Sequence, residues 1–169
     1  MYNIPTSVNT SNKQNNIKLL VLLITLILLI PVVIIATKVK LFNTHGHSME
    51  PLIKDNSYVI CIKSNSIERG DIIAFNANGD IAIKRVIGLS NETIDIKEDG
   101  RVYIGTELLK ENYVSNPTIG KYEIRLPHKV SPNSVFVLGD NRENSLDSRH
   151  LKVGDIKLDE IICEVKLVL

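Results

Sequence analysis

Ser48 is the first residue whose type and setting suggest chemistry. It lies in Gly46-His47-Ser48-Met49-Glu50-Pro51, with a glycine before it and a proline after it. This composition predicts a bent, rigid segment that holds the Ser48 hydroxyl in a fixed direction. A serine hydroxyl becomes a useful nucleophile only beside a base that accepts its proton. The segment therefore indicates nucleophilic catalysis if a base lies close to it in the fold.

Lys84 is the candidate base that its strand favours. In Ile81-Ala82-Ile83-Lys84-Arg85-Val86-Ile87, alternation places Lys84 on one face with Ala82 and Val86. Apolar neighbours disfavour the charged form of lysine, whose free pKa is about 10.4, and lowering it to about 7.5 requires roughly 4 kcal/mol. The pattern predicts an amine that can accept a proton near neutral pH. The alternative is a solvated lysine with no catalytic role.

Histidines offer a competing assignment. His47 adjoins Ser48, but neighbouring side chains on an extended segment point to opposite faces. Asp147 and His150 could complete a Ser-His-Asp set with Ser48, and the sequence leaves that alternative open. His45 and His47 could share a metal ion, but two imidazoles without further ligands do not predict a site. We expect no metal and no cofactor.

A dense polar segment, GDNRENSLDSR, runs from Gly139 to Arg149. An ordinary hairpin loop does not need so many charged and amide groups. The segment could orient a catalytic amine through a hydroxyl such as that of Ser145. Two ion pairs could fix its loops: Asp147 with Arg149, or Asp140 with Arg142. A solvated loop is the alternative interpretation.

Short β-strands are the elements that would position these residues. Runs rich in Ile and Val recur after residue 43, at Tyr58 to Ile62, Ile72 to Phe75, Ile81 to Ile87, Ile94 to Ile96, Val102 to Ile104 and Val135 to Leu138. Turn formers separate several of them, at Asn78-Gly79-Asp80 and Glu98-Asp99-Gly100. No stretch of more than about ten residues after Lys40 shows clean helical periodicity. The sequence predicts an all-β domain over residues 38–169.

The N-terminal part has a different composition. Residues 1–18 are rich in Asn, Ser, Thr and Lys and are predicted to be a disordered polar tail. The uncharged run from Leu19 to Ala36 spans about 27 Å as a helix, close to the ~30 Å of a bilayer core. We predict a transmembrane helix over residues 19–37. A removable signal sequence is the alternative, but its apolar run is usually shorter and ends in a small-x-small site.

Charge and cysteine content exclude some functions and leave others open. Twenty Lys and Arg against nineteen Asp and Glu give a net charge of +1, which predicts no nucleic-acid partner. Lysines flank the apolar run on both sides, so the positive-inside rule does not decide its orientation. Cys61 and Cys163 form no C-x-x-C motif and are expected to be core residues, with a single disulfide as the less favoured alternative.

Three ordered groups of residues resemble bacterial type I signal peptidases. They are Ser48-Met49-Glu50-Pro51, then Arg69-Gly70-Asp71-Ile72-Ile73 with Lys84-Arg85-Val86-Ile87-Gly88, and finally Gly139 to Arg149. Their order and spacing resemble those of the family, and together they cover most of residues 44–163. An N-terminal anchor also occurs where the family has one. The short span between Gly88 and Val135 resembles the compact Gram-positive form.

The resemblance implies roles for individual residues in an antiparallel β domain. Ser48 would attack the scissile carbonyl while neutral Lys84 accepts its proton, and a Lys84-activated water would hydrolyse the acyl-enzyme. Ser145 would hydrogen-bond the Lys84 amine, and the Ser48 backbone N–H would help to form the oxyanion hole. Asp140, Asp147 and Arg149 would support the site. Substrate would bind as an added strand, contacting Gly46, Met49, Ala82 and Ile83.

The resemblance also implies a location and partners. The protein would be a single-pass protein of the bacterial cell membrane, with a cytoplasmic N-terminus and an extracytoplasmic catalytic domain. Its partners would be membrane lipid, the secretion translocon and the signal peptides of secretory precursors, cut after an Ala-x-Ala-like site. Three alternatives remain: a Ser-Lys self-cleaving repressor, a specialised pilin-type signal peptidase and an inactive membrane-anchored homologue. The first would carry a DNA-binding domain where this chain has its apolar run.

Overall fold

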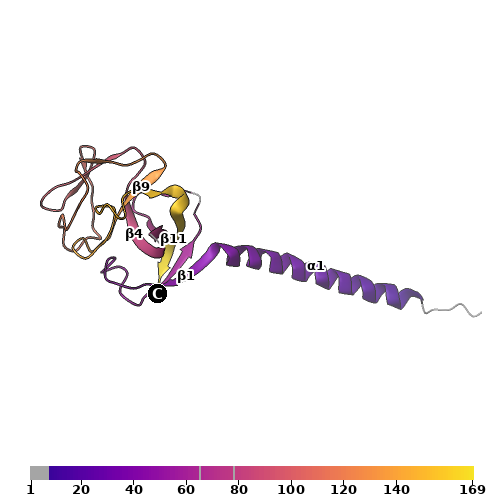
Figure 1. Cartoon of the computed structure of the whole chain (residues 1–169). Coiled ribbons are helices and arrows are strands. Elements are labelled where there is room, and N and C mark those ends of the chain that lie inside the picture. The colour runs from indigo at the N-terminus through magenta and orange to yellow at the C-terminus, as the bar shows by residue number, and fades with distance from the viewer. Residues whose placement is uncertain (1–7, 65, 78) are drawn as a thin grey trace, which may run out of the picture. The chain divides into compact units, whose positions relative to one another are not determined.

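The computed structural model of the protein describes residues 8–64, 66–77 and 79–169. The chain divides into two units at the boundary between Lys38 and Val39. The first contains one helix and the second contains the β-strands (Figure 1). Part of the predicted polar tail, residues 1–7, and Asn78 of the predicted turn lie outside the described residues.

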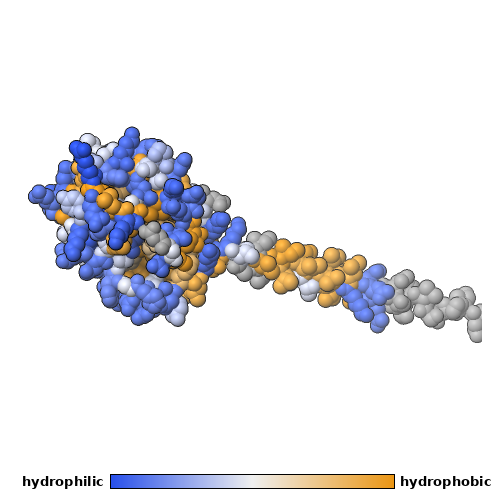
Figure 2. All heavy atoms as spheres, viewed as in Figure 1, coloured by the Kyte–Doolittle hydropathy of each residue, from blue (hydrophilic) through white to orange (hydrophobic). Residues whose placement is uncertain are grey.

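Helix α1 spans Val8–Lys38 and has Pro31 inside it. Its window Gln14–Pro31 is long and apolar enough to cross a membrane. All side chains from residue 14 to residue 31 are exposed, and Figure 2 shows apolar residues along most of this part of the helix, with hydrophilic residues at its N-terminal end. The predicted disorder is wrong for residues 8–18, which are helical. Extending an existing helix costs much less than nucleating one, so a stable apolar helix can propagate into a polar flank.

The second unit is built from antiparallel strands in two sheets. The larger sheet has the order β1-β2-β11-β3-β4-β9-β10, and the smaller has the order β7-β6-β5-β8. The bounds are β1 Val39–Asn43, β2 Tyr58–Ile62, β3 Ile72–Ala77, β4 Asp80–Gly88, β5 Thr93–Ile96, β6 Val102–Ile104, β7 Glu107–Leu108, β8 His128–Lys129, β9 Ser134–Leu138, β10 Ile156–Lys157 and β11 Ile161–Val168, with a 3₁₀ helix at Leu158–Glu160. The predicted all-β class of antiparallel sheets is confirmed.

All six predicted strands are present, and the sequence reasoning missed five others. Three of these, β7, β8 and β10, have two residues each, too few for any periodicity to reveal. Strand β1 begins directly after helix α1, just beyond the predicted transmembrane segment of residues 19–37. Strand β11 lies inside the larger sheet, between β2 and β3.

Strand β4 lies between two of the hydrophobic clusters of the core. Its Val86 packs under the larger sheet with Ile73, Phe75 and Val137. The next residue, Ile87, packs on the opposite side in the cluster that the smaller sheet covers. The C-terminal half of β4 is therefore buried on both faces, whereas Asp80 and Ile81 at its start are exposed. This arrangement fixes the position of the strand that carries Lys84.

Cys61 and Cys163 form a disulfide, with a Cα–Cα distance of 5.6 Å across a sequence separation of 102 residues. The preference for two unbonded core cysteines is therefore wrong, although both side chains are buried. The reason lies in the sheet order: β2 and β11 are antiparallel neighbours, so their cysteines come together despite their distance in sequence. The bond joins one of the first strands of the domain to its last.

Replacing both cysteines by alanine is expected to lower the free energy of unfolding by about 2–4 kcal/mol, because the disulfide closes a long loop in the unfolded chain. Urea unfolding of the detergent-solubilised full chain measures this loss. Dithiothreitol in the denaturant should shift the unfolding midpoint of the wild type and leave that of the double variant unchanged. A wild type that is equally stable with and without reductant would contradict the expectation.

Candidate active site

A cleft of about 440 Å³ lies between the start of strand β4 and the segment after strand β1. The predicted nucleophile and base, Ser48 and Lys84, both line it. So do all four residues predicted to bind substrate, Gly46, Met49, Ala82 and Ile83. Segments 36 residues apart in sequence therefore meet at one cleft.

The Ser48 segment is held rigidly on its N-terminal and core sides. Gly46 has a φ of +94°, a conformation that favours glycine, and its N–H donates to Asp55 Oδ1 at 2.8 Å. Met49 is buried in a core cluster with Ile53, and its carbonyl accepts from the Ile53 N–H at 3.0 Å. The residue after Ser48 thus anchors the segment in the core, which leaves the Ser48 side chain at the cleft.

The polar segment after strand β9 holds the same loop from the other side. The Asn141 backbone N–H donates to the Ser48 carbonyl at 3.0 Å, and Asn141 Nδ2 donates to the His47 carbonyl at 3.0 Å. Gly139 lies so close that an added Cβ would come within 2.5 Å of the Ser48 carbonyl oxygen and 2.2 Å of Ser145 Oγ. Only glycine fits this contact.

Lys84 meets Ser48 in the cleft. Its side chain projects from strand β4, the residue is 6% exposed, and Nζ lies 2.8 Å from Ser48 Oγ and 2.9 Å from the Ile83 carbonyl oxygen. Burial lowers the pKa of Lys84 to about 8, although the negative charges of Asp147 and Asp140 oppose this shift. The amine is therefore close to a hydroxyl and is more readily deprotonated than a surface lysine.

The competing histidine arrangement is not assembled. His47 Nδ1 lies 2.8 Å from Glu50 Oε1, and this hydrogen bond raises the pKa of His47. His150 Nδ1 is buried without a hydrogen-bond partner among the described residues. The Asp147 carboxylate binds Arg149 and the Gly139 N–H instead of an imidazole. The Ser-His-Asp alternative therefore lacks the hydrogen bond between its histidine side chain and the Asp147 carboxylate.

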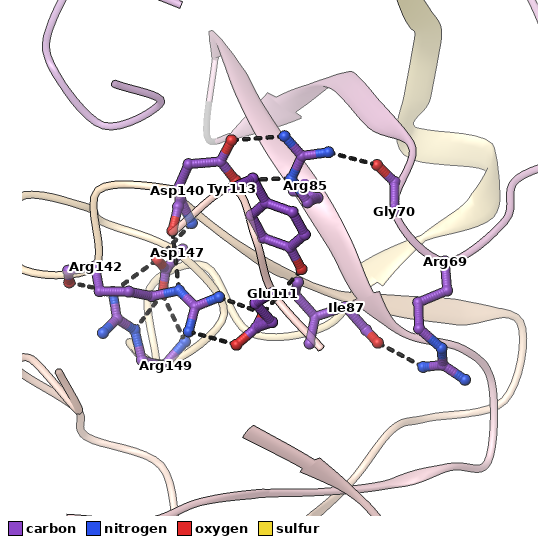
Figure 3. A network of polar contacts seen from close by, with 11 residues as sticks. Arg69, Gly70, Arg85, Ile87, Glu111, Tyr113, Asp140, Arg142, Asp147 and Arg149 are labelled. Atoms are coloured by element: carbon purple, nitrogen blue, oxygen red, sulfur yellow. Dashed lines mark hydrogen bonds and ion pairs between the residues drawn. The ribbon is translucent and has the colours of Figure 1, made fainter. Parts of the chain in front are cut away.

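Figure 3 shows a buried network of ion pairs that joins strand β4 to the polar segment after strand β9. The predicted pair of Asp147 with Arg149 is present, through Nε at 2.8 Å and Nη2 at 2.9 Å, with both side chains almost fully buried. Asp147 Oδ2 also accepts from the Gly139 N–H at 3.0 Å. This carboxylate therefore fixes both the arginine and the backbone that faces Ser48.

The predicted pair of Asp140 with Arg142 is wrong. Asp140 forms a bidentate pair with Arg85, at 2.8 Å and 2.6 Å, and Arg142 pairs with Glu111 (Figure 3). Arg85 follows Lys84 on strand β4 and so leaves the opposite face of the sheet, where it meets the end of strand β9. The spacing of charges within one loop could not reveal partners that strand β4 and the loop after strand β7 supply.

The predicted hydrogen bond between Ser145 and Lys84 is not formed in this structure. Ser145 Oγ is buried and has no hydrogen-bond partner in the part of the chain that the structure describes. The Lys84 amine is instead bound to Ser48 and to the Ile83 carbonyl. The Ser145 side chain packs against Gly139, so it lies beside the backbone that contacts Ser48.

Sequence reasoning missed four residues that contact the ion-pair network or the Ser48 segment: Arg85, Glu111, Tyr113 and Asn141. The Arg85 guanidinium lies 4.0 Å from the centre of the Tyr113 ring, and Tyr113 donates to Glu111 at 2.9 Å. Arg85 carried a usable signal, since a charge in the buried half of a strand needs a partner. Glu111 and Tyr113 carried none, because the loop that contains them shows no periodic pattern.

Known proteins share sequence and fold with this chain. A family model described as signal peptidase, peptidase S26, matches residues 16–169. Signal peptidase I U of Bacillus subtilis is 33% identical over 94% of this chain and 91% of its own length. The probable signal peptidase I-2 of Synechocystis is 33% identical over 72% of this chain and 62% of its own length, so the chain spans less than two thirds of that relative.

A solved structure gives the same relationship in three dimensions. The crystal structure of a signal peptidase I from Enterococcus faecalis is 31% identical, with a TM-score of 0.52, over 60% of this chain and 98% of the solved chain. This match supports the antiparallel β domain described above. The chain therefore belongs to the signal peptidase family S26, and its relatives within that family are type I signal peptidases.

Proposed function

We propose that this protein is a membrane-bound endopeptidase that removes signal peptides from secretory precursors by means of a Ser48-Lys84 dyad. One observation carries the proposal: Lys84 Nζ lies 2.8 Å from Ser48 Oγ in an open cleft. Hydroxyl and amine are within the distance that proton transfer requires. The pKa of Lys84, lowered to about 8, supports its role as the base.

The proposed reaction follows from these positions. Neutral Lys84 accepts the Ser48 proton as Oγ attacks the scissile carbonyl, and the Ser48 backbone N–H donates to the developing oxyanion. The protonated amine then donates to the leaving nitrogen, and a water activated by Lys84 hydrolyses the acyl-enzyme. We propose that Ser145 helps to orient the amine during these steps, since its buried hydroxyl lies beside Gly139. No step requires a metal or a cofactor.

The substrate is proposed to bind as an added strand along the start of β4. Strand β3 pairs with β4 from Asp80 to Arg85, whereas β9 pairs only from Arg85 to Gly88. Among the described residues, no strand pairs with the remaining edge of Asp80 to Lys84, which lines the cleft. An extended peptide can hydrogen-bond to that edge, and Met49, Ala82 and Ile83 favour small apolar side chains near the cut.

Cleavage is expected to rise with pH through a midpoint of about 8, because only the neutral Lys84 amine accepts a proton. The pKa is lowered, so the active neutral form persists above the midpoint and is lost as pH falls below it. At pH 7 about one molecule in ten would carry the neutral amine. Initial rates on one precursor between pH 6 and pH 10 measure the midpoint. A midpoint near pH 10 would contradict the proposed burial effect.

We propose that α1 spans the bacterial membrane with its N-terminus in the cytoplasm and the β domain outside. The Cys61–Cys163 disulfide supports this orientation, since stable disulfides are typical of oxidising compartments and rare in the cytoplasm. The proposed partners are secretory precursors, membrane lipid and the secretion translocon. Nothing in the charge of the chain favours a nucleic acid.

Cleavage of a precursor by the detergent-solubilised full chain tests the function, with the new N-terminus read by mass spectrometry. A cut after an Ala-x-Ala-like site would support the proposal. Cleavage of pilin precursors alone would favour the specialised alternative, and no cleavage of either substrate would favour an inactive homologue. The contact of Ser48 with Lys84 argues against that last alternative.

A further inference from the structure

The loop that follows strand β7 in the smaller sheet reaches into the buried ion-pair network (Figure 3). Leu109 ties the start of this loop to strand β6, since its N–H donates to the Val102 carbonyl at 2.9 Å. Leu109 and Tyr113 also pack against the core cluster under the smaller sheet. From this base, Glu111 and Tyr113 point toward Arg142 and Arg85 (Figure 3).

Glu111 neutralises the buried positive charge of Arg142. Three of the guanidiniums in the network are buried: Arg85, Arg142 and Arg149 are 8%, 2% and 1% exposed. Asp140 and Asp147 neutralise two of them. The third, Arg142, pairs with Glu111 from outside the polar segment, whereas Glu143, its neighbour in sequence, is exposed. A buried cation without its partner is strongly destabilising, so the contact is essential to the position of Arg142.

Arg142 in turn holds the backbone that faces the dyad. Its Nε donates to the Gly139 carbonyl at 3.2 Å. Gly139 is the residue in close contact with the Ser48 carbonyl and the Ser145 hydroxyl. A continuous path of contacts therefore runs from Glu111 through Arg142 and Gly139 to the nucleophile segment.

Tyr113 links this path to the strand that carries the base. Its hydroxyl donates to Glu111 Oε1 at 2.9 Å, and its ring lies 4.0 Å from the Arg85 guanidinium carbon. Arg85 directly follows Lys84 and binds Asp140 through two hydrogen bonds. The loop therefore contacts Arg142, which holds the backbone near Ser48, and Arg85, which follows Lys84.

We infer that Glu111 is a positioning residue of the Ser48-Lys84 dyad that acts through Arg142, and that Tyr113 holds it in place. The inference rests on the proposed function for its effect on the reaction. It gives the smaller sheet a role in catalysis, although that sheet contributes no residue to the cleft.

Glu111→Gln tests the inference, and Glu143→Gln is a matched control that removes the same charge from an exposed neighbour of Arg142. Misplacing a catalytic group by about 1 Å can cost about 100-fold, so we expect kcat to fall about 10- to 100-fold with KM within about twofold. Glu111→Asp should recover part of the loss. The full chain in detergent cleaves the same precursor in each case. A Glu111→Gln variant that keeps the kcat of the control would overturn the inference.

A double variant separates positioning through Arg142 from a general loss of folding. Arg142→Gln combined with Glu111→Gln removes both partners and leaves no unpaired buried charge. If Glu111 acts through Arg142, the double variant will have a kcat no lower than that of Arg142→Gln alone. If the fold-loss of kcat in the double variant equals the product of the losses in the two single variants, Glu111 acts independently of Arg142 and the proposed path is overturned.

A second readout does not depend on cleavage. Acetic anhydride modifies neutral, accessible amines, so its rate of reaction with Lys84 at pH 7, read by mass spectrometry, reports the surroundings of that side chain. We expect Lys84 to react several-fold faster in Glu111→Gln than in Glu143→Gln, and exposed Lys129 to react equally in both. An unchanged Lys84 rate would overturn the inference even if the chain cleaved no precursor. If the wild type cleaves no precursor but Lys84 reacts faster in Glu111→Gln, the proposed function is contradicted and the inference about Glu111 stands.

Discussion

Alanine at Ser48 or at Lys84 is expected to lower precursor cleavage by at least about 10³-fold, the largest effect of any substitution in the chain. Ser48→Ala removes the atom that would attack the carbonyl. Lys84→Ala leaves the serine without a base, since Lys84 Nζ is the amine that lies 2.8 Å from its hydroxyl. Single-turnover cleavage of a precursor by the full chain in detergent measures both losses.

Two further comparisons make this expectation specific. Because the two residues act as a unit, the double variant should be no slower than either single variant. Ser115→Ala and Lys129→Ala remove exposed side chains of the same types and should leave the rate within about twofold. Retained activity in Lys84→Ala would show that another group accepts the proton, and His150→Ala would then be the next variant to measure.

Asp147→Ala is expected to lower the free energy of unfolding by about 3–5 kcal/mol, the largest effect on stability. Its carboxylate is fully buried and binds the Arg149 guanidinium and the Gly139 N–H. Without it, Arg149 keeps an unpaired charge in the interior. Urea unfolding of the variant in detergent, followed by far-ultraviolet circular dichroism, measures the loss.

Asp99→Ala provides a matched control for this stability change. Asp99 pairs with Arg101 at the same two-residue spacing, but both side chains are about half exposed. An exposed pair contributes about 0–1 kcal/mol, so this substitution should barely change the unfolding midpoint. Equal losses in the two variants would mean that burial does not determine the value of the Asp147 pair.

The sequence predicted the strands whose side chains alternate or lie in apolar runs, and with them the strand that carries Lys84. It also predicted the pair of Asp147 with Arg149, because the two residues are neighbours in one tight loop. It failed where a contact depends on the sheet order. The disulfide, the pair of Arg85 with Asp140 and the pair of Arg142 with Glu111 each join segments at least 31 residues apart.

Ser145 shows a second limit of sequence-based prediction, because its predicted hydrogen bond to Lys84 is not formed. Its place in the polar segment predicted a hydroxyl near the site, and the structure places it beside Gly139. Its hydrogen bond to Lys84 depends on angles and on competing acceptors, and the Ile83 carbonyl is such an acceptor on the same strand. Within one short segment, position along the chain can place a group near the site, but side-chain orientation decides which groups form hydrogen bonds.

The open edge of strand β4 also bears on the solubility of the domain. An unpaired edge with apolar side chains can recruit the strand of another chain, and proteins usually protect such edges with charges or with a covering segment. Here Ile81 is 51% exposed beside Ala82 and Ile83, and Asp80 is the charged residue at the start of the edge. An edge that binds the proposed substrate peptide cannot be covered permanently. The chain thus keeps a site for self-association wherever its concentration is high and no peptide occupies the edge.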